Sequence, residues 1–83
     1  MHPMHIAYDP GADAIYVTLA AGDYARGKDV DDDRHVDYAA DGTPIGVEFL
    51  NVYHGILLDD AIPGRPEIEK LIRQLGHVQI LAA

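Results

Sequence analysis

The chain has 83 residues, a formal net charge of −8 from 14 acidic and 6 basic residues, and no Cys. This length allows one small domain with a thin core, and without Cys neither a disulfide nor a thiolate metal site can reinforce it. The charge argues against binding to nucleic acid and against docking on a membrane surface, because both need clustered basic residues. With no signal-peptide pattern and no apolar run near the ~20 residues of a membrane helix, we expect a cytoplasmic protein.

Two strands are predicted at the N-terminal end. Alternating apolar residues indicate a first strand that ends near Tyr8 and a second strand over residues 14–19. Pro10 and Gly11 lie between them and favour a type II turn, in which Pro presets φ and Gly accepts a positive φ. The two strands are therefore expected to form an antiparallel hairpin.

The middle of the chain is more acidic and less regular. Residues 24–33 hold a single inward-facing apolar residue, Val30, and predict at most an edge strand, whose charges would prevent stray pairing. A turn over residues 31–33 leads into a strand over residues 34–38. The central residue of that strand, Val36, faces the core, and its two neighbours face outward.

A second hairpin is predicted at Asp41-Gly42. We expect a type I′ turn there, which needs a positive φ at both central positions. Pro44 has no N–H to donate, so it is expected at the start of the next strand. That strand continues to Leu50, with Ile45, Val47 and Phe49 on its apolar face.

The C-terminal part contains one clear helix. Residues 56–58 are a short apolar run that is expected to continue the sheet after a bend. Residues 66–75 predict an amphipathic helix, with Pro66 at its first position and Gly76 as its C-terminal cap. Residues 77–81 predict a short final strand or a tail.

The expected fold class is therefore α+β. Residues 1–83 are expected to form a single domain. Its core is an antiparallel β-meander of four to five strands over residues 6–52, followed by the helix and the short strand.

Three blocks of the sequence resemble a known family of short bacterial proteins, the domain of unknown function numbered 2283. The blocks are Tyr8-Asp9 to Tyr16, Val36-Asp37-Tyr38, and Asp41-Gly42 to Leu50. The resemblance covers about residues 6–52. It implies a small β-rich module with no assigned activity. Members of the family often lie beside genes for small toxin-like proteins, which implies an antitoxin-like binding role.

The first candidate site is acidic. Half of the acidic residues lie between residues 23 and 41. If residues 29–37 formed one continuous strand, a set of side chains on one side could bind a divalent cation. That set is Asp29, Asp31, Asp33, His35 and Asp37. Its spacing does not fit an EF-hand loop, and residues two apart on a strand lie about 6.5–7 Å apart. We therefore expect a solvated edge and no metal site.

Glu48 is the second candidate. Beside Tyr16 or Tyr38 it could have a raised pKa and act as a base. The chain has neither Cys nor Ser as a nucleophile, so covalent catalysis is poorly supported. We expect no catalytic residue, no enzyme activity and no cofactor. The residues expected to contribute to binding are Tyr8, Asp13, Tyr16, Tyr38 and Glu48.

Three functions remain open. The favoured one is an acidic protein-binding module, antitoxin-like, that forms a homodimer or larger homo-oligomer and binds a basic protein. The second is a purely structural homodimer, in which strand edges and the apolar tail at residues 78–81 pair across a two-fold axis. The third is a small acid–base or metal-dependent enzyme that uses Glu48 or the segment at residues 29–37.

Overall fold

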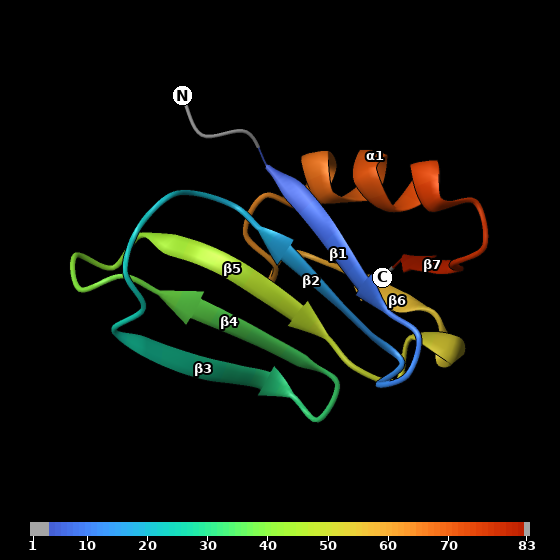
Figure 1. Ribbon diagram of the computed structural model, residues 1–83, viewed down its shortest axis with the longest axis horizontal. Coiled ribbons are helices and arrows are strands. Elements are labelled where there is room, and N and C mark those ends of the chain that lie inside the picture. Colours follow the sequence, from blue (N-terminus) through green and yellow to red (C-terminus); the bar gives the residue numbers. More distant parts are fainter. Residues whose placement is uncertain (1–3, 83) are drawn as a thin grey trace.

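The computed structural model describes residues 4–82 and contains two layers, a five-stranded antiparallel sheet and a helical layer on one of its faces (Figure 1). Residues 1–3 and 83 lie outside the described part. The strands of this main sheet are β1 (His5–Asp9), β2 (Ala14–Thr18), β3 (Arg26–Asp31), β4 (Arg34–Tyr38) and β5 (Pro44–Phe49). The α+β class is confirmed.

The strand order differs from a simple meander. It is β1-β2-β5-β4-β3, so β3, β4 and β5 form a meander, but β5 returns to pair with β2. In the register of that pair, Tyr16 lies opposite Glu48 and Val17 lies opposite Val47. The long connection from β2 to β3 therefore carries the chain across to the far edge of the sheet before it turns back.

The C-terminal part forms a second unit behind the sheet. It consists of the 3₁₀ helix η1 (Val52–His54), β6 (Ile56–Leu58), α1 (Arg65–Leu75) and β7 (Ile80–Ala82). The expectation that residues 56–58 continue the main sheet is wrong, because β6 pairs in parallel with β7 in a sheet of its own. The predicted helix is confirmed, with Pro66 in its first turn and Gly76 at φ 78° beyond its last. Within residues 4–82, no helix has the length and apolar character needed to cross a membrane.

Both hairpins lie where they were predicted, but with different turns. Gly11 does not have a positive φ; Asp13 takes the left-handed conformation instead, at φ 52°. In the second hairpin only Gly42 has a positive φ, at 90°, and its N–H donates to the carbonyl of Ala39. The loop is thus a turn followed by one left-handed glycine, a common three-residue hairpin connection, rather than a type I′ turn.

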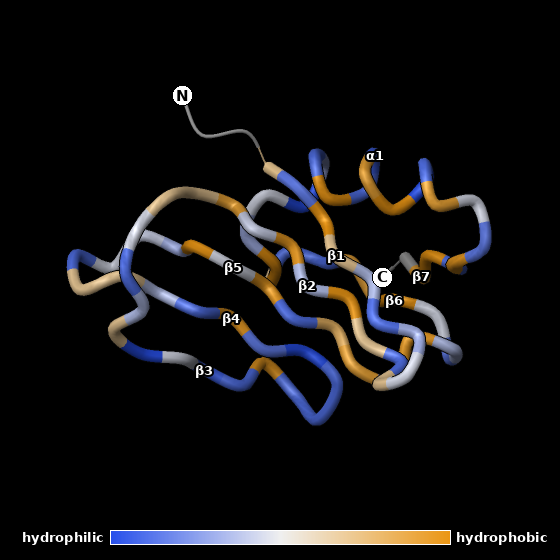
Figure 2. The backbone as a smooth tube through the Cα atoms, viewed as in Figure 1, coloured by the Kyte–Doolittle hydropathy of each residue, from blue (hydrophilic) through white to orange (hydrophobic). Residues whose placement is uncertain are grey.

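The core lies between the main sheet and the C-terminal unit. Period-two alternation along the central strands places one set of apolar side chains on the inner face, and Ile68 and Ile72 of α1 pack against it. The inner-face residues are Ile15, Val17, Val36, Val47 and Phe49. Figure 2 shows the same apolar segments along the central strands and on the inner side of the helix. Full burial of each such side chain contributes about 1.5–3 kcal/mol to the free energy of folding.

Arg34 connects the two units. Its side chain is only 8% exposed, and it forms ion pairs with Asp31 at 2.7 Å and Asp59 at 2.9 Å. A further hydrogen bond runs from Nη1 to the carbonyl oxygen of Leu57 at 3.3 Å. Because Asp31 ends β3 while Leu57 belongs to β6, this one guanidinium joins the main sheet to the second sheet.

Candidate functional site

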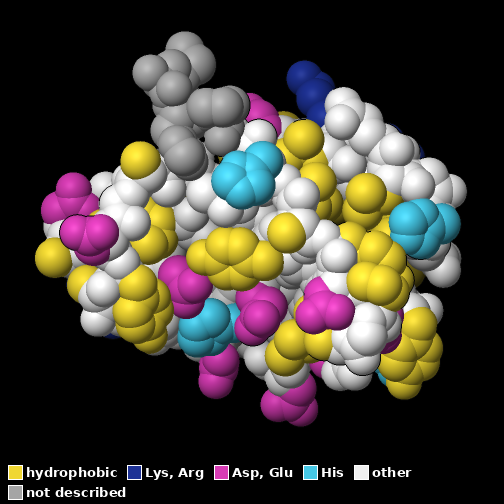
Figure 3. Space-filling view, viewed as in Figure 1, with side chains coloured by type: hydrophobic (Ala, Val, Ile, Leu, Met, Phe, Trp, Pro, Cys, Tyr) yellow, Lys and Arg dark blue, Asp and Glu magenta, His cyan; other side chains and the backbone are white. Residues whose placement is uncertain are grey.

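The outer face of the main sheet, turned away from α1, carries a cluster of polar side chains that we call the open face. Register places Tyr16 beside Glu48, Glu48 beside His35, and His35 beside Asp29, from β2 across to β3. The neighbouring row is Thr18, Gly46, Asp37 and Gly27. Figure 3 views this face and shows acidic side chains around a histidine over the central strands.

Four of these side chains form a hydrogen-bonded chain that spans four strands, the open-face network. The Tyr16 hydroxyl donates to Asp37 Oδ2 at 2.9 Å. The other oxygen of Asp37 lies 2.9 Å from Nε2 of His35, and Nδ1 of His35 lies 2.7 Å from Asp29. Carboxylates only accept hydrogen bonds, so both contacts of His35 are satisfied only by the doubly protonated imidazolium.

Two glycines make room for the rings of this network. A Cβ on Gly46 would collide with the hydroxyl and ring of Tyr16, and a Cβ on Gly27 would collide with the His35 ring. Each ring therefore lies across the glycine of the next strand. This arrangement lets the rings of Tyr16 and His35 lie close to the sheet and form hydrogen bonds with Asp37 and Asp29.

The network changes the proton affinities of its members. Burial of Tyr16 raises the pKa of its phenol to about 12, and the hydrogen bond to Asp37 and the negative charges of Asp37 and Glu48 act in the same direction. The pKa of His35 is also raised. Its hydrogen bond to Asp29 is the main cause, and the contact with Asp37 adds to it against the opposing effect of burial.

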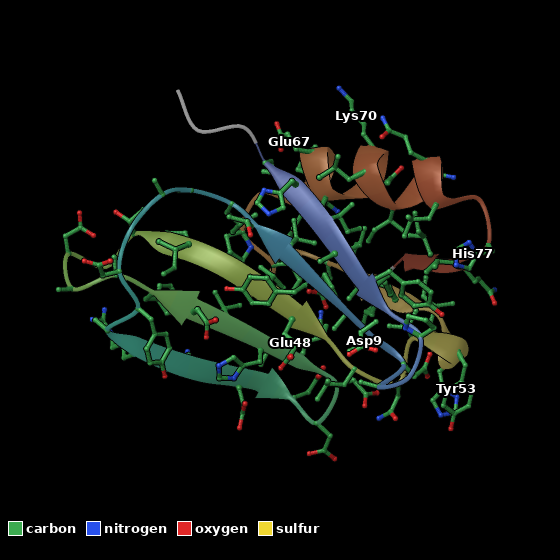
Figure 4. All side chains as sticks on the ribbon, viewed as in Figure 1. Asp9, Glu48, Tyr53, Glu67, Lys70 and His77 are labelled. Atoms are coloured by element: carbon green, nitrogen blue, oxygen red, sulfur yellow. The ribbon has the colours of Figure 1, made fainter. Side chains whose placement is uncertain are left out.

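Glu48 lies half-buried at the centre of the open face, between Tyr16 and His35 in the register (Figure 4). Its carboxylate forms no hydrogen bond or ion pair with any residue between 4 and 82. The sequence predicted its strand face and left open whether Tyr16 or Tyr38 lies beside it; in the structure the neighbour is Tyr16. Tyr38 faces the opposite side of the sheet, where it lies beneath the Arg26 guanidinium at 5.7 Å.

The other predicted binding residues have structural contacts of their own. Tyr8 faces the helix side, and its ring meets the His77 ring edge-on at 5.3 Å. Asp13 accepts hydrogen bonds from the N–H groups of Val52, through its carbonyl, and Tyr53, through its carboxylate, both at 3.1 Å. Asp13 thus holds η1 against the first hairpin. Of the five residues predicted for binding, only Tyr16 and Glu48 share the open face.

The acidic segment is a hairpin rather than one continuous strand. Asp29 and His35 remain together on the open face, whereas a register shift between Asp29 and Asp31 turns Asp31 towards Arg34 on the other side. Asp33 lies in the turn and accepts a hydrogen bond from Asn51 Nδ2 at 2.7 Å. No group of three or more potential ligands is arranged to hold a metal ion within the part of the chain that the structure describes.

The roles of Asp37 and the two glycines were not predicted. Asp37 was placed in the acidic run, in the block Val36-Asp37-Tyr38 and at an outward position of its strand, but none of these indicated a contact with Tyr16. It meets Tyr16 because β5 pairs with both β2 and β4, and this pairing joins segments that are distant in sequence. The only local signal was glycine inside a strand, which often marks a close approach of another group.

Basic side chains are absent from the open face. The six Lys and Arg of the chain lie on α1 or on strand positions that face the other side: Arg26, Lys28, Arg34, Arg65, Lys70 and Arg73. On β3, Lys28 pairs with the buried Val36 and so shares the inner face. The open face carries Asp29, Asp37 and Glu48 near its centre and Asp9 at the end of β1. Among residues 4–82, histidine is the only side chain of the open face that can carry a positive charge.

A cleft with a volume of about 200 Å³ lies elsewhere, between the β3–β4 turn and the β6–β7 sheet. Its wall includes Arg34, Phe49 and Leu81 but neither Glu48 nor any other member of the open-face network. The polar network and the described cleft are therefore separate features.

The family comparison agrees with the earlier resemblance. A family model described as "Protein of unknown function (DUF2283)" matches residues 5–52. No curated protein and no solved structure shows significant similarity to the chain. The matched residues include all five strands of the main sheet and the whole open-face network, whereas α1, β6 and β7 follow them. The chain belongs to the DUF2283 family.

Proposed function

We propose that the protein is a protein-binding module, antitoxin-like in its role, whose open face binds a basic surface of a partner protein. The observation that carries this proposal is the charge of that face. Carboxylates of Asp29, Asp37 and Glu48 lie together on it, and it has no Lys or Arg within residues 4–82. A surface of one sign attracts a partner of the other sign and excludes partners of the same sign.

The shape of the face supports binding more than catalysis. Tyr16 and His35 lie across glycines and form hydrogen bonds with Asp37 and Asp29, so these two carboxylates are held in position. Fixed side chains lose little conformational entropy when a partner binds. Acid–base catalysis by Glu48 is the rival function, but such sites are usually concave, and the described cleft does not include Glu48.

We further propose that the module acts as a homodimer. Strand β7 has a single neighbour, β6, in the described sheet, so its other edge is open to pairing. Apolar side chains are exposed close by: Leu81 on β7 is 38% exposed and Tyr53 on η1 is 73% exposed. Light scattering at tens of micromolar should give the mass of two chains, and a monomer mass would contradict this.

The binding proposal is tested by co-expression with the product of the adjacent gene. Wild-type protein should copurify with that product if it is basic, and its retention should fall as salt is raised. The double variant Asp29→Asn/Glu48→Gln removes two open-face charges and should weaken retention at least tenfold. The control Asp23→Asn/Asp60→Asn removes two exposed charges elsewhere and should retain the partner.

Equal retention by the two double variants would contradict a role for the open face. Failure of the wild-type protein to bind the basic product at low salt would contradict the whole proposal. Circular dichroism and a melting curve of each variant show whether lost retention comes from lost folding instead.

A further inference from the structure

The cleft beside the β3–β4 turn has an apolar base and an acidic edge. Its volume of about 200 Å³ is below the range of sites for drug-sized ligands and suits a single side chain. The lining residues that matter here are Asp31, Asp33, Arg34, Phe49, Leu57 and Leu81. Phe49 is buried and forms part of the base, while Leu81 is 38% exposed and stands at the edge.

Arg34 does not make this cleft a site for anions. Its Nε and Nη2 groups both donate to Asp31, at 2.9 and 2.7 Å. Its Nη1 group donates to Asp59 at 2.9 Å and to the Leu57 carbonyl at 3.3 Å. The guanidinium is therefore surrounded by acceptors of the same chain, and two carboxylates neutralise its charge.

Asp33 retains the capacity to bind a cation. Its Oδ1 accepts a hydrogen bond from Asn51 at 2.7 Å, whereas its Oδ2 has no partner among the residues that the structure describes. Among the lining residues, Arg34 is the only Lys or Arg. The cleft thus combines an apolar base with a net negative edge.

An aromatic surface borders the cleft. His54 lines it, and the Tyr53 ring stacks against the His54 ring with 3.9 Å between the ring centroids. Tyr53 is the most exposed large apolar residue of the described chain. Tyrosines of this kind are enriched in protein interfaces, often beside pockets that receive an anchoring side chain.

We propose that this cleft receives one basic side chain, Lys or Arg, from the partner protein. The methylene stem would lie on Phe49 and Leu57, and the charged end would lie at Asp33, as long basic side chains commonly divide between apolar and polar surroundings. This inference rests on the proposed function, since a basic partner supplies the side chain. The β3–β4 hairpin connects the two surfaces, because it presents Asp29 to the open face and Asp33 to the cleft.

The test uses a probe that imitates an arginine side chain. Titration of the full chain with n-butylguanidinium at pH 7.5 should produce saturable shifts of the backbone amide signals of Gly55, Leu57 and Leu81. Guanidinium ion supplies the charge without the stem, and n-butanol supplies the stem without the charge. Each should bind at least fivefold more weakly than n-butylguanidinium.

Two matched variants test whether Asp33 binds the charged end of the probe. Asp33→Asn removes the proposed partner of the cation and keeps an oxygen for Asn51, so it should weaken binding of the probe at least threefold. Asp32→Asn removes the same charge one residue away, outside the lining, and should bind as the wild type does. Absence of saturable shifts in the wild type, or equal weakening by the two variants, would overturn the inference.

These outcomes are separate from the test of the open face. If the probe fails to bind while Asp29→Asn/Glu48→Gln still loses the partner, the cleft is excluded and the proposed function stands. If the probe binds while no basic partner is retained, the cleft accepts a cation but its assignment to a protein partner is wrong.

Discussion

Tyr16 on β2 reaches Asp37 on β4 by crossing Gly46, which lies on the strand between them. The contact exists because Gly46 has no side chain: any Cβ there would occupy the place of the Tyr16 hydroxyl and ring. His35 repeats the arrangement one strand further on, across Gly27. The polar network therefore depends on two residues that contribute no polar side-chain atom to it.

Replacing Gly46 with alanine should destabilise the protein by about 2–4 kcal/mol. The new methyl group displaces the Tyr16 ring, and the cost of overpacking adds to that of the lost hydrogen bond with Asp37. Urea unfolding measures the loss. In a Tyr16→Ala background the same change should cost less than about 1 kcal/mol, because the collision is gone.

Gly11→Ala is the matched control. Gly11 does not have a positive φ, and its Cβ would meet Asp9 Oδ1 at 3.4 Å, an ordinary contact. We expect a change within about 0.5 kcal/mol. If Gly46→Ala were as mild as this control, the Tyr16 ring would not lie across Gly46 in solution.

Tyr16→Phe should make the free energy of unfolding depend less on pH in alkaline buffer. The pKa of Tyr16 is raised from about 10 to about 12 on folding, so the folded state holds the proton more tightly than the unfolded state. The associated stability is complete below pH 10 and is lost as the pH rises through about 12. Wild-type protein should therefore lose more stability than Tyr16→Phe over this range.

The phenolate absorbance at 295 nm gives a second measurement on the same variant. The chain has five tyrosines, and the component that titrates at highest pH should disappear in Tyr16→Phe. If the two titration curves kept the same high-pH component, the raised pKa would belong to another tyrosine.

Asp29→Asn should lower the pKa of His35. Folding raises the pKa of this imidazole above 6.5, mainly through its hydrogen bond to Asp29. The stability gained is complete below pH 6.5 and is lost as the pH rises through the folded pKa. The stability difference between wild type and Asp29→Asn should therefore be larger in mildly acidic than in alkaline buffer.

Proton NMR of the His35 ring measures this directly, since its Cε1–H signal reports the charge of the imidazole. The pH at the midpoint of this titration should be lower in Asp29→Asn than in the wild type. It should be unchanged in Asp23→Asn, which removes a charge elsewhere on the chain. Equal midpoints in the wild type and in Asp29→Asn would show that the Asp29 contact is absent in solution.

Arg34→Met should lower the free energy of unfolding by about 2–4 kcal/mol, because it removes the hydrogen bond from the main sheet to β6 and leaves two carboxylates without their cation. Arg34 lowers the pKa of both Asp31 and Asp59, chiefly by hydrogen bonding. The linked stability is present above about pH 4 and is lost as the pH falls through the folded pKa values. The stability of the variant should therefore also fall less than that of the wild type as the pH is lowered below about 4.

Arg73→Met is the control for this variant. Arg73 forms an exposed ion pair with Glu69 one turn away on α1, at 3.0 Å. Such pairs contribute little, and we expect a change within about 0.5 kcal/mol in urea unfolding. Similar losses in the two variants would show that Arg34 acts as an ordinary surface charge.

The parts of the fold that sequence predicted are those set by near neighbours. Helix α1 is defined by an apolar stripe that includes Ile68 and Ile72 and by the cap at Gly76, and all of these are contacts between neighbouring turns. Turn type was predicted less well, because the left-handed residue is Asp13 rather than Gly11. Asp13 is held there by its two bonds to η1, which lies some forty residues further along the chain.

For the site, the sequence predicted which face of its strand each side chain occupies, but not which strands pair. Alternation placed Glu48 and Tyr16 on outward positions, and the structure confirms both. The link from Tyr16 to Asp37 requires the pairing of β5 with β2, and the separation of Asp31 from Asp29 requires a bulge. Neither is a local property, so a short window of sequence carries no sign of them.

The molecule has unbalanced negative charge on its open face, whereas Arg34, Arg65 and Arg73 on the other side are paired with carboxylates. Its six fixed cations lie on or behind the inner face, while the open face presents Asp29, Asp37 and Glu48 outward. An approaching cationic surface is attracted to the open face before any contact forms. Capture would then depend on salt through the rate of association, with the rate of dissociation little changed.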